Sequence, residues 1–209
     1  PPLARARGVW TRDAPGKGLG DCTKTWCDDV NGSTNRSSRY TLTAIVLHWA
    51  MAALIIGTLF LGWYMVDLPL TPSRVRLFNY HKWVGITILS LAAARLAWRL
   101  FHQPPALPDD LPRWQQRAAH VVHWLLYALF FAVPLAGWAF TSAAGFPVVY
   151  LGLIPFPDWV PVDKTLAEQL AILHAVLAYS LATVVALHIA AALKHALEER
   201  PTNYMRRML

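Results

Sequence analysis

Two histidines in one apolar segment have the spacing needed to hold two separate cofactors. His174 and His188 are fourteen residues apart, which corresponds to about 21 Å of rise along an α-helix. Fourteen steps of about 100° come within about 40° of four full turns, so both imidazoles point to the same side of the helix. Imidazole is a common metal ligand. Metal cofactors stacked one in each half of a membrane need this arrangement.

The composition requires a membrane protein. Hydrophobic residues make up 56% of the 209 residues and charged residues 15%, against about 45–50% and about 25% in a typical globular domain. A helix crosses the hydrocarbon core with about 20 mostly apolar residues. The sequence therefore predicts an all-α fold, an integral membrane four-helix bundle over residues 40–209. The expected spans are 41–66, 80–101, 118–140 and 169–195.

Basic residues predict the orientation of the bundle. Fifteen of the 19 Lys and Arg lie before Tyr40, between Arg95 and Arg117, or from Lys194 onward, and four lie on the other side. Because cytoplasmic segments carry the excess of Lys and Arg, we expect both termini in the cytoplasm. In a Gram-negative bacterium this would place the protein in the inner membrane with its outer connections facing the periplasm. The net charge of +7 is then a signal of topology, and no nucleic-acid partner is expected.

Each histidine of the fourth span has a partner at matching depth. His48 lies near the inner start of the first span, and His188 lies near the inner end of the fourth. On the outer side, His81 begins the second span and His174 lies near the start of the fourth. The topology therefore predicts an inner pair, His48 with His188, and an outer pair, His81 with His174.

The residues one turn beyond these histidines favour haem as the cofactor. A helix that holds haem through histidine needs a small residue there, because the flat macrocycle needs room against the backbone. The four proposed ligands have Ala or Gly four residues on: Ala52, Gly85, Ala178 and Ala192. The third-span histidines His120 and His123 have Trp124 and Tyr127 at this offset and are excluded as ligands.

Iron bound by two imidazoles keeps no open position, which suits electron transfer. One alternative is that the histidines form hydrogen bonds between helices. A zinc or di-iron site would need carboxylates at the same depth, and the predicted spans contain none. The C-x-x-C-H motif of covalent haem attachment is also absent, so non-covalent haem is the favoured interpretation.

Two arginines inside the second span are candidates for binding haem propionates. Arg95 lies fourteen residues after His81, on the same helix face but near the inner site. A guanidinium binds a carboxylate through two parallel hydrogen bonds, and Arg99 lies one turn further toward the cytoplasm. The alternative is that both side chains extend to the inner membrane surface as topology markers.

Residues 1–39 differ in composition from the rest of the chain. Small and polar residues dominate there, and no apolar stretch resembles a secretory signal. We therefore expect a flexible polar arm in the cytoplasm. Cys22 and Cys27 have no nearby His or further Cys to complete a zinc site, so reduced thiols are expected.

Several stretches between about residues 40 and 209 carry a family resemblance: LHW at 47–49, NYHKWVG at 79–85, RLAWRL at 95–100, AAHVVHWLLYALFFAVPLAGW at 118–138, LHAVLAYSLATVVALHIAAALKH at 173–195 and PTNYMRRML at 201–209. With these stretches the chain resembles the bacterial cytochrome b561 family, which is related to the membrane cytochrome subunits of nickel hydrogenases. The resemblance implies two non-covalent b haems with ligands at His48, His81, His174 and His188.

The resemblance also implies an activity. Members of the family move electrons between membrane quinone and a partner, and at least one relative is a superoxide oxidase that passes an electron from superoxide to ubiquinone. By resemblance we expect an enzyme, a superoxide:ubiquinone oxidoreductase, with membrane lipid, ubiquinone and superoxide or another periplasmic one-electron partner. The alternatives are an electron-carrier subunit docked to a dehydrogenase or hydrogenase and a haem-free structural bundle. A homodimer and a complex with a partner enzyme are both compatible with the sequence.

Charge on the outer side predicts where an anion arrives. The first outer connection, residues 67–82, has a net charge of +2, whereas the second, residues 141–168, has −2. A small anion such as superoxide would be steered to the positive potential beside the outer haem. Arg74, Arg76 and Lys82 are therefore the candidates for acting on the substrate. The alternative is that they contact lipid headgroups or an outer-haem propionate.

Overall fold

The computed structural model describes residues 40–102 and 112–197. The predicted arm at residues 1–39, with Cys22 and Cys27, lies outside the described residues, as do 103–111 and 198–209.

The described chain folds into four long helices. Each helix is long and apolar enough to cross a membrane. They are α2 (Leu42–Val66), α3 (Pro72–Phe101), α4 (Arg113–Ala143) and α5 (Lys164–Leu197). The prediction of an all-α fold with four membrane-spanning helices is therefore confirmed.

Helix α3 begins earlier than the sequence predicted. The Thr71 hydroxyl accepts a hydrogen bond from the Arg74 N–H at 3.3 Å, and Pro72 occupies the first turn, which together make a strong N-terminal signal. An apolar composition marks only the part of a helix inside hydrocarbon, whereas the helix itself continues into polar sequence. Residues 72–82 of the predicted outer connection therefore belong to α3, and only residues 67–71 lie between α2 and α3.

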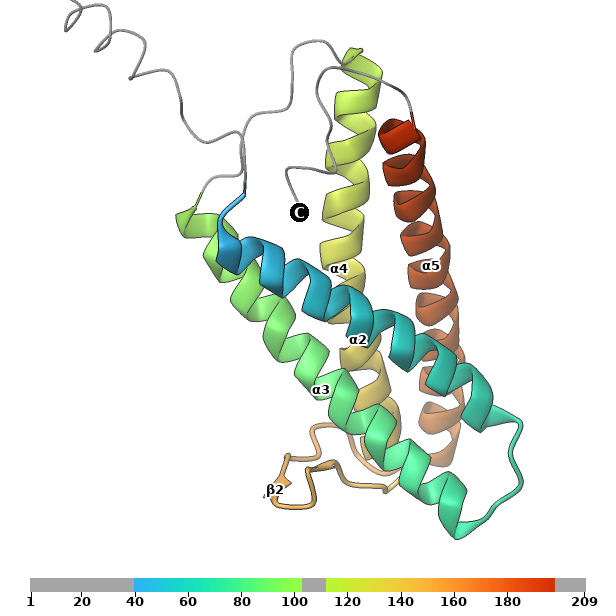
Figure 1. Ribbon diagram of the computed structural model, residues 1–209. Helices are drawn as coiled ribbons and strands as arrows, with labels where there is room; N and C mark the ends of the chain where they lie inside the picture. Colours follow the sequence, from blue (N-terminus) through green and yellow to red (C-terminus); the bar gives the residue numbers. More distant parts are fainter. Residues whose placement is uncertain (1–39, 103–111, 198–209) are drawn as a thin grey trace, which may run out of the picture. The chain divides into compact units, whose positions relative to one another are not determined.

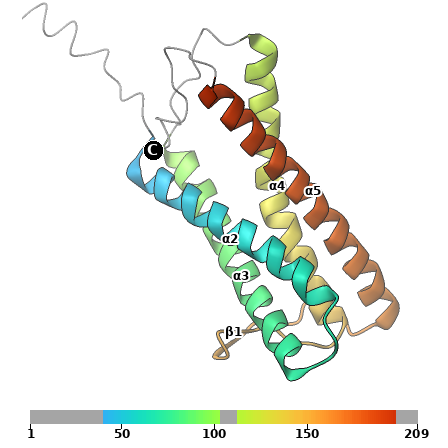
Figure 2. The same cartoon turned by 45° about the vertical axis from the view of Figure 1, so that its right-hand side comes forward.

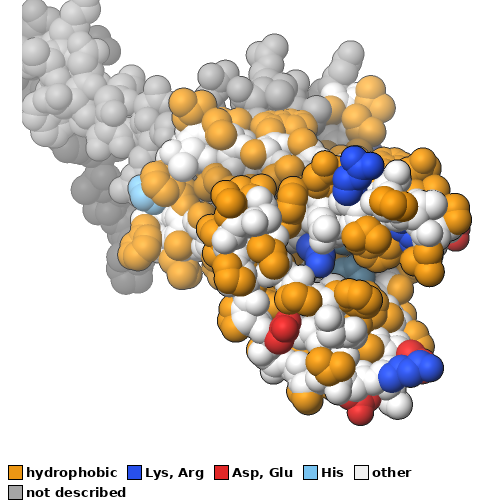
Figure 3. Space-filling view, turned by 90° about the horizontal axis from the view of Figure 1, so that it is seen from below, with side chains coloured by type: hydrophobic (Ala, Val, Ile, Leu, Met, Phe, Trp, Pro, Cys, Tyr) orange, Lys and Arg blue, Asp and Glu red, His pale blue; other side chains and the backbone are white. Residues whose placement is uncertain are grey.

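The helices form a bundle in which α5 is held mainly by one neighbour. The closely packed pairs among the described helices are α2 with α3, α3 with α4, and α4 with α5, as Figures 1 and 2 show. Helix α5 is not closely packed against either α2 or α3. The α2–α3 and α4–α5 connections lie at the same end of the bundle (Figure 1), which we call the outer end and which Figure 3 views from below.

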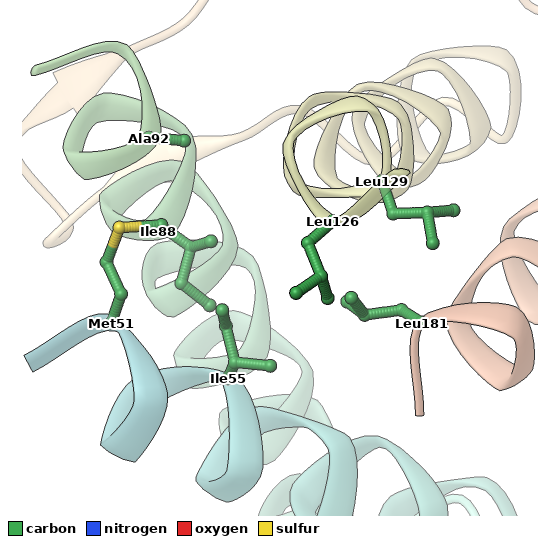
Figure 4. Close-up of a cluster of buried hydrophobic side chains, with 7 residues drawn as sticks. All are labelled: Met51, Ile55, Ile88, Ala92, Leu126, Leu129 and Leu181. Carbon is green, nitrogen blue, oxygen red and sulfur yellow. The ribbon is translucent and has the colours of Figure 1, made fainter. Parts of the chain in front are cut away.

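A layer of buried apolar side chains occupies the middle of the bundle (Figure 4). This central cluster consists of Met51, Ile55, Ile88, Ala92, Leu126, Leu129 and Leu181. Leu181 lies seven residues after His174 and seven before His188, so the cluster includes a residue midway between the two histidine levels, while Met51, three residues after His48, extends it toward the inner level. Close packing of this kind, rather than transfer out of water, holds helices together inside lipid.

The connection from α4 to α5 contains a small antiparallel hairpin. Its strands are β1 (Val149–Tyr150) and β2 (Ile154–Pro155), with Tyr150 opposite Ile154. The turn places Gly152 at φ +73°, a left-handed conformation that glycine adopts without steric cost. The sequence predicted an outer connection over residues 141–168 but not the strand pairing within it.

Candidate functional site

His81 of α3 and His174 of α5 face each other near the outer end. Their ring centroids are 6.1 Å apart, and the ring planes are inclined by 85°. Because α3 and α5 are not a closely packed pair, the two imidazoles meet in the space between these helices. The structure thus brings together the rings that the depth argument paired, while haem ligation by them stays a prediction.

The surroundings orient one nitrogen of each outer ring. Nδ1 of His174 donates a hydrogen bond to the Val133 carbonyl at 3.0 Å. Nδ1 of His81 lies 3.3 Å from the Thr58 hydroxyl. A metal-binding histidine typically uses its second nitrogen in this way, which fixes the ring and leaves the other nitrogen for the metal. In both residues the nitrogen left for a metal is Nε2.

Two glycines on neighbouring helices make room for these rings. A Cβ built on Gly137 of α4 would lie 2.9 Å from Cε1 of His174, and one built on Gly62 of α2 would lie 3.1 Å from Cε1 of His81. Any larger residue at either position would push the imidazole aside. Around Gly85, one turn after His81, a Cβ would meet nothing within 4 Å, which leaves space beside the proposed ligand.

The inner pair is formed by His48 of α2 and His188 of α5. Their ring centroids are 6.3 Å apart and the planes are inclined by 72°. Both side chains are partly buried. Since α2 and α5 are not among the closely packed helices, this pair also bridges two separate elements.

Both pairs have the separation that one metal ion between two imidazoles requires. A metal–imidazole bond is about 2.0–2.1 Å long, and the ring centroid lies roughly 1.1 Å beyond the nitrogen, so two rings on opposite sides of a metal have centroids about 6 Å apart. The observed values of 6.1 and 6.3 Å match this distance. Each pair therefore fits a metal ion, such as haem iron, held between its two imidazoles.

His123 of α4 lies beside the inner pair, which the sequence argument did not anticipate. Its ring centroid is 5.5 Å from that of His188, shorter than the separation expected across a metal ion. Geometry therefore favours His48 as the partner of His188 and makes His123 a close neighbour of the inner site.

Arg95 supplies a positive charge to the inner site. It is close enough to His48, His123 and His188 to interact electrostatically with all three. Its Nε donates to the Tyr127 hydroxyl at 3.3 Å. Its Nη1 is buried and has no hydrogen-bond partner among the described residues. A buried guanidinium nitrogen without a hydrogen-bond partner destabilises the protein. This nitrogen is therefore placed to donate to an anion such as a haem propionate.

Tyr127 and Arg99 complete this corner of the inner site. Tyr127 is 8% exposed and was noted in the sequence only as a bulky neighbour of His123. The Arg99 guanidinium lies over the rings of Trp124, at 5.5 Å, and Tyr127, at 5.4 Å. A cation over aromatic rings is stabilised by their negative faces, so Arg99 is anchored within the protein.

The three predicted outer cations all lie on α3 rather than in a loop. The Arg74 Nη2 donates to the Val66 carbonyl at 3.1 Å, where a cation is favourable because it meets the negative end of α2. The Lys82 Nζ donates to the Pro147 carbonyl at 3.1 Å. Arg76 is exposed. Arg74 and Lys82 thus make hydrogen bonds within the protein. The view of the outer end shows a histidine near Lys or Arg side chains (Figure 3).

Comparison with known proteins agrees with this architecture. The profile of the prokaryotic cytochrome b561 family matches residues 39–209. Cytochrome b561 homolog 2 of Escherichia coli strain K12 is 30% identical, over 84% of this chain and 94% of the relative. Probable superoxide oxidase CybB of Yersinia pestis is 30% identical, over 81% and 96%. Cytochrome b561 homolog 1 of Escherichia coli strain K12 is 29% identical, over 82% and 97%.

The family match extends over all four helices and includes all four paired histidines. Four helices able to cross a membrane fit a bacterial inner-membrane protein, and the family implies b-type haem and electron transfer. The chain therefore belongs to the prokaryotic cytochrome b561 family.

Proposed function

We propose that the chain holds two non-covalent b haems, one between His48 and His188 and one between His81 and His174. The observation that carries this proposal is the presence of two imidazole pairs, with centroids 6.3 and 6.1 Å apart, at two levels about 21 Å apart along α5. Haem held by two imidazoles has no open coordination position and supplies one-electron transfer.

The surrounding side chains hold these ligands and balance charge. The contacts of His81 with Thr58 and of His174 with Val133 orient Nε2 of each ring toward the iron position. At the inner site, the unpartnered Nη1 of Arg95 supports its assignment to a propionate. Arg99 adds positive charge one turn closer to the inner end.

We further propose that the protein is a superoxide:ubiquinone oxidoreductase. Two superoxide anions would give up one electron each, and with two protons these would convert ubiquinone to ubiquinol and release two molecules of oxygen. The name of the Yersinia pestis relative, probable superoxide oxidase, supports superoxide as the electron donor. The positive charge of Arg74, Arg76 and Lys82 at the outer end of α3 would favour the approach of the anion.

The distribution of Lys and Arg supports an orientation with both termini in the cytoplasm. Fifteen of 19 basic residues lie on the side of the termini, and such an excess marks the cytoplasmic face. In this orientation the outer end faces the periplasm, and superoxide would be taken from that side.

The function is tested with the purified protein in detergent or nanodiscs. Xanthine oxidase would supply superoxide, and the reduction of ubiquinone would be followed by absorbance, with superoxide dismutase as the control that removes the donor. We expect ubiquinol formation that requires both superoxide and the haem-loaded protein. Haem-loaded protein that reduces no quinone, and that co-purifies with a dehydrogenase or hydrogenase, would replace this proposal with an electron-carrier subunit.

A further inference from the structure

The hairpin between α4 and α5 is attached to the side of α3. We call residues 145–157 the outer hairpin. The Nζ of Lys82 donates to the Pro147 carbonyl at 3.1 Å, and Nε1 of Trp83 donates to the Val149 carbonyl at 2.6 Å. The Tyr150 hydroxyl lies 3.0 Å from that of Thr87. In Figures 1 and 2 the hairpin lies beside α3.

These contacts fix the depth of the outer hairpin. All three α3 residues lie inside the predicted second span, 80–101. Thr87 is six residues past His81, about 9 Å further along α3, and it is next to Ile88 of the central cluster. The Thr87 hydroxyl is on a short side chain close to the α3 backbone, so the Tyr150 hydroxyl, 3.0 Å from it, lies at about the depth of Thr87. The outer hairpin therefore turns back along the bundle instead of projecting away from the outer end.

The backbone of the outer hairpin is adapted to a medium without water. The strands pair with each other. The N–H groups of Gly145 and Phe146 donate to carbonyls in the last turn of α4, and those of Gly152, Leu153 and Phe156 donate to carbonyls within the hairpin. Proline at positions 147, 155 and 157 has no N–H to satisfy. Non-helical backbone is tolerated at membrane depth only when its polar groups are satisfied in this way.

The exposed surface of the outer hairpin is apolar. Residues 145–157 contain no charged side chain. Phe146 is 67% exposed, Leu151 55%, Leu153 80% and Ile154 54%. Leu151 also has φ +53°, a left-handed conformation in which Gly or Asn would avoid strain. A water-facing turn rarely places large apolar side chains at such positions.

We propose that the outer hairpin inserts into the lipid leaflet at the outer end, where Phe146, Leu151, Leu153 and Ile154 contact the glycerol and upper acyl-chain region beside α3. The occupant of this apolar surface is lipid, because the surface carries no charge and is continuous with the lipid-facing side of a spanning helix. The proposal does not depend on the identity of the electron donor or acceptor.

The test uses nitroxide spin labels on the full chain in lipid nanodiscs. In a background with Cys22→Ser and Cys27→Ser, single variants Leu153→Cys, Ser73→Cys and Tyr179→Cys would be labelled. Ser73, exposed in the first turn of α3, is the water control, and Tyr179, exposed in the middle of α5, is the lipid control. Collision rates with oxygen, which concentrates in acyl chains, and with a water-soluble nickel chelate measure depth.

We expect the ratio of oxygen to nickel collisions at position 153 to be nearer to that at 179 than to that at 73. A ratio nearer to that at 73 would overturn the proposal and make the hairpin an aqueous loop. Low accessibility to both reagents would also overturn it, because the surface would then be covered by protein. The haem absorption spectrum of each variant reports folding, and Ile154→Cys replaces Leu153→Cys if that variant loses its haem.

Discussion

Replacing Gly137 with alanine is expected to remove the outer haem and leave the inner one in place. The new Cβ would lie 2.9 Å from Cε1 and 3.0 Å from Nδ1 of His174. Non-bonded carbon atoms rest about 3.5–4.0 Å apart, so the ring has to move by roughly 0.6–1 Å. That movement would stretch or break the hydrogen bond from Nδ1 to Val133, which is 3.0 Å long.

The expected loss of haem affinity at the outer site is large for the addition of a single methyl group. Removing the partner that orients a metal-binding histidine costs about 10–100-fold in metal affinity. We therefore expect at least a tenfold loss of affinity at the outer site, with haem content falling from two per chain toward one. Alanine is favoured over glycine inside a helix by about 0.8–1.0 kcal/mol, so a weaker α4 would not account for the loss.

The assay is a pyridine haemochrome determination per chain, combined with low-temperature electron paramagnetic resonance of the two low-spin signals. Gly57→Ala is the matched control, because a Cβ there meets nothing within 4 Å, and Gly62→Ala, at 3.1 Å from Cε1 of His81, should have an intermediate effect. Two haems with unchanged spectra in Gly137→Ala would refute the reasoning.

Four further predictions follow from the same geometry. His174→Ala should lose only the outer haem and His188→Ala only the inner one; haemochrome content tests this, and loss of neither haem would show that the pairing is wrong. His123→Ala should keep both haems, and loss of one would make His123 a ligand. Arg95→Leu should lower the potential of the inner haem in a redox titration, because one charge at roughly 10 Å and an effective dielectric constant of about 20 contributes about 1–2 kcal/mol, or some tens of millivolts; an unchanged potential would exclude contact with a propionate. Arg76→Glu should slow haem reduction by superoxide at low salt and keep the haem content, with the difference shrinking as salt shortens the range of the field; a rate indifferent to charge and salt would exclude steering.

The parts of the fold that depend on chain periodicity were predictable. The fourteen-residue spacing of His174 and His188 fixes both their depths and their common face, because helix rise and twist are nearly constant. The number of membrane-spanning helices followed from the lengths of the apolar stretches, because the rise per residue of a helix is nearly constant. These arguments predicted that His48 lies near His188 and His81 near His174, and the structure has both pairs of rings close together, while ligation of haem by them stays a prediction.

The parts that depend on how helices meet were not predictable. The roles of Gly62, Gly137 and Thr58 arise from contacts between different helices, and glycine is too common in membrane helices to signal such a contact. His123 was excluded as a ligand because a bulky residue lies one turn away. That reasoning concerns the room for a haem beside His123 and does not predict whether His123 lies close to His188. The strand pairing in the outer hairpin involves only two residues on each strand, too few to leave a periodic pattern.

The central claim is that two imidazole pairs on one four-helix chain each hold a b haem. It is tested most directly by measuring haem b per chain in the purified full-length protein, together with a redox titration followed by electron paramagnetic resonance. The account predicts two haems per chain, both low-spin with two imidazole ligands, titrating as two one-electron centres. A single haem per chain, or a high-spin iron with an open position, would contradict it.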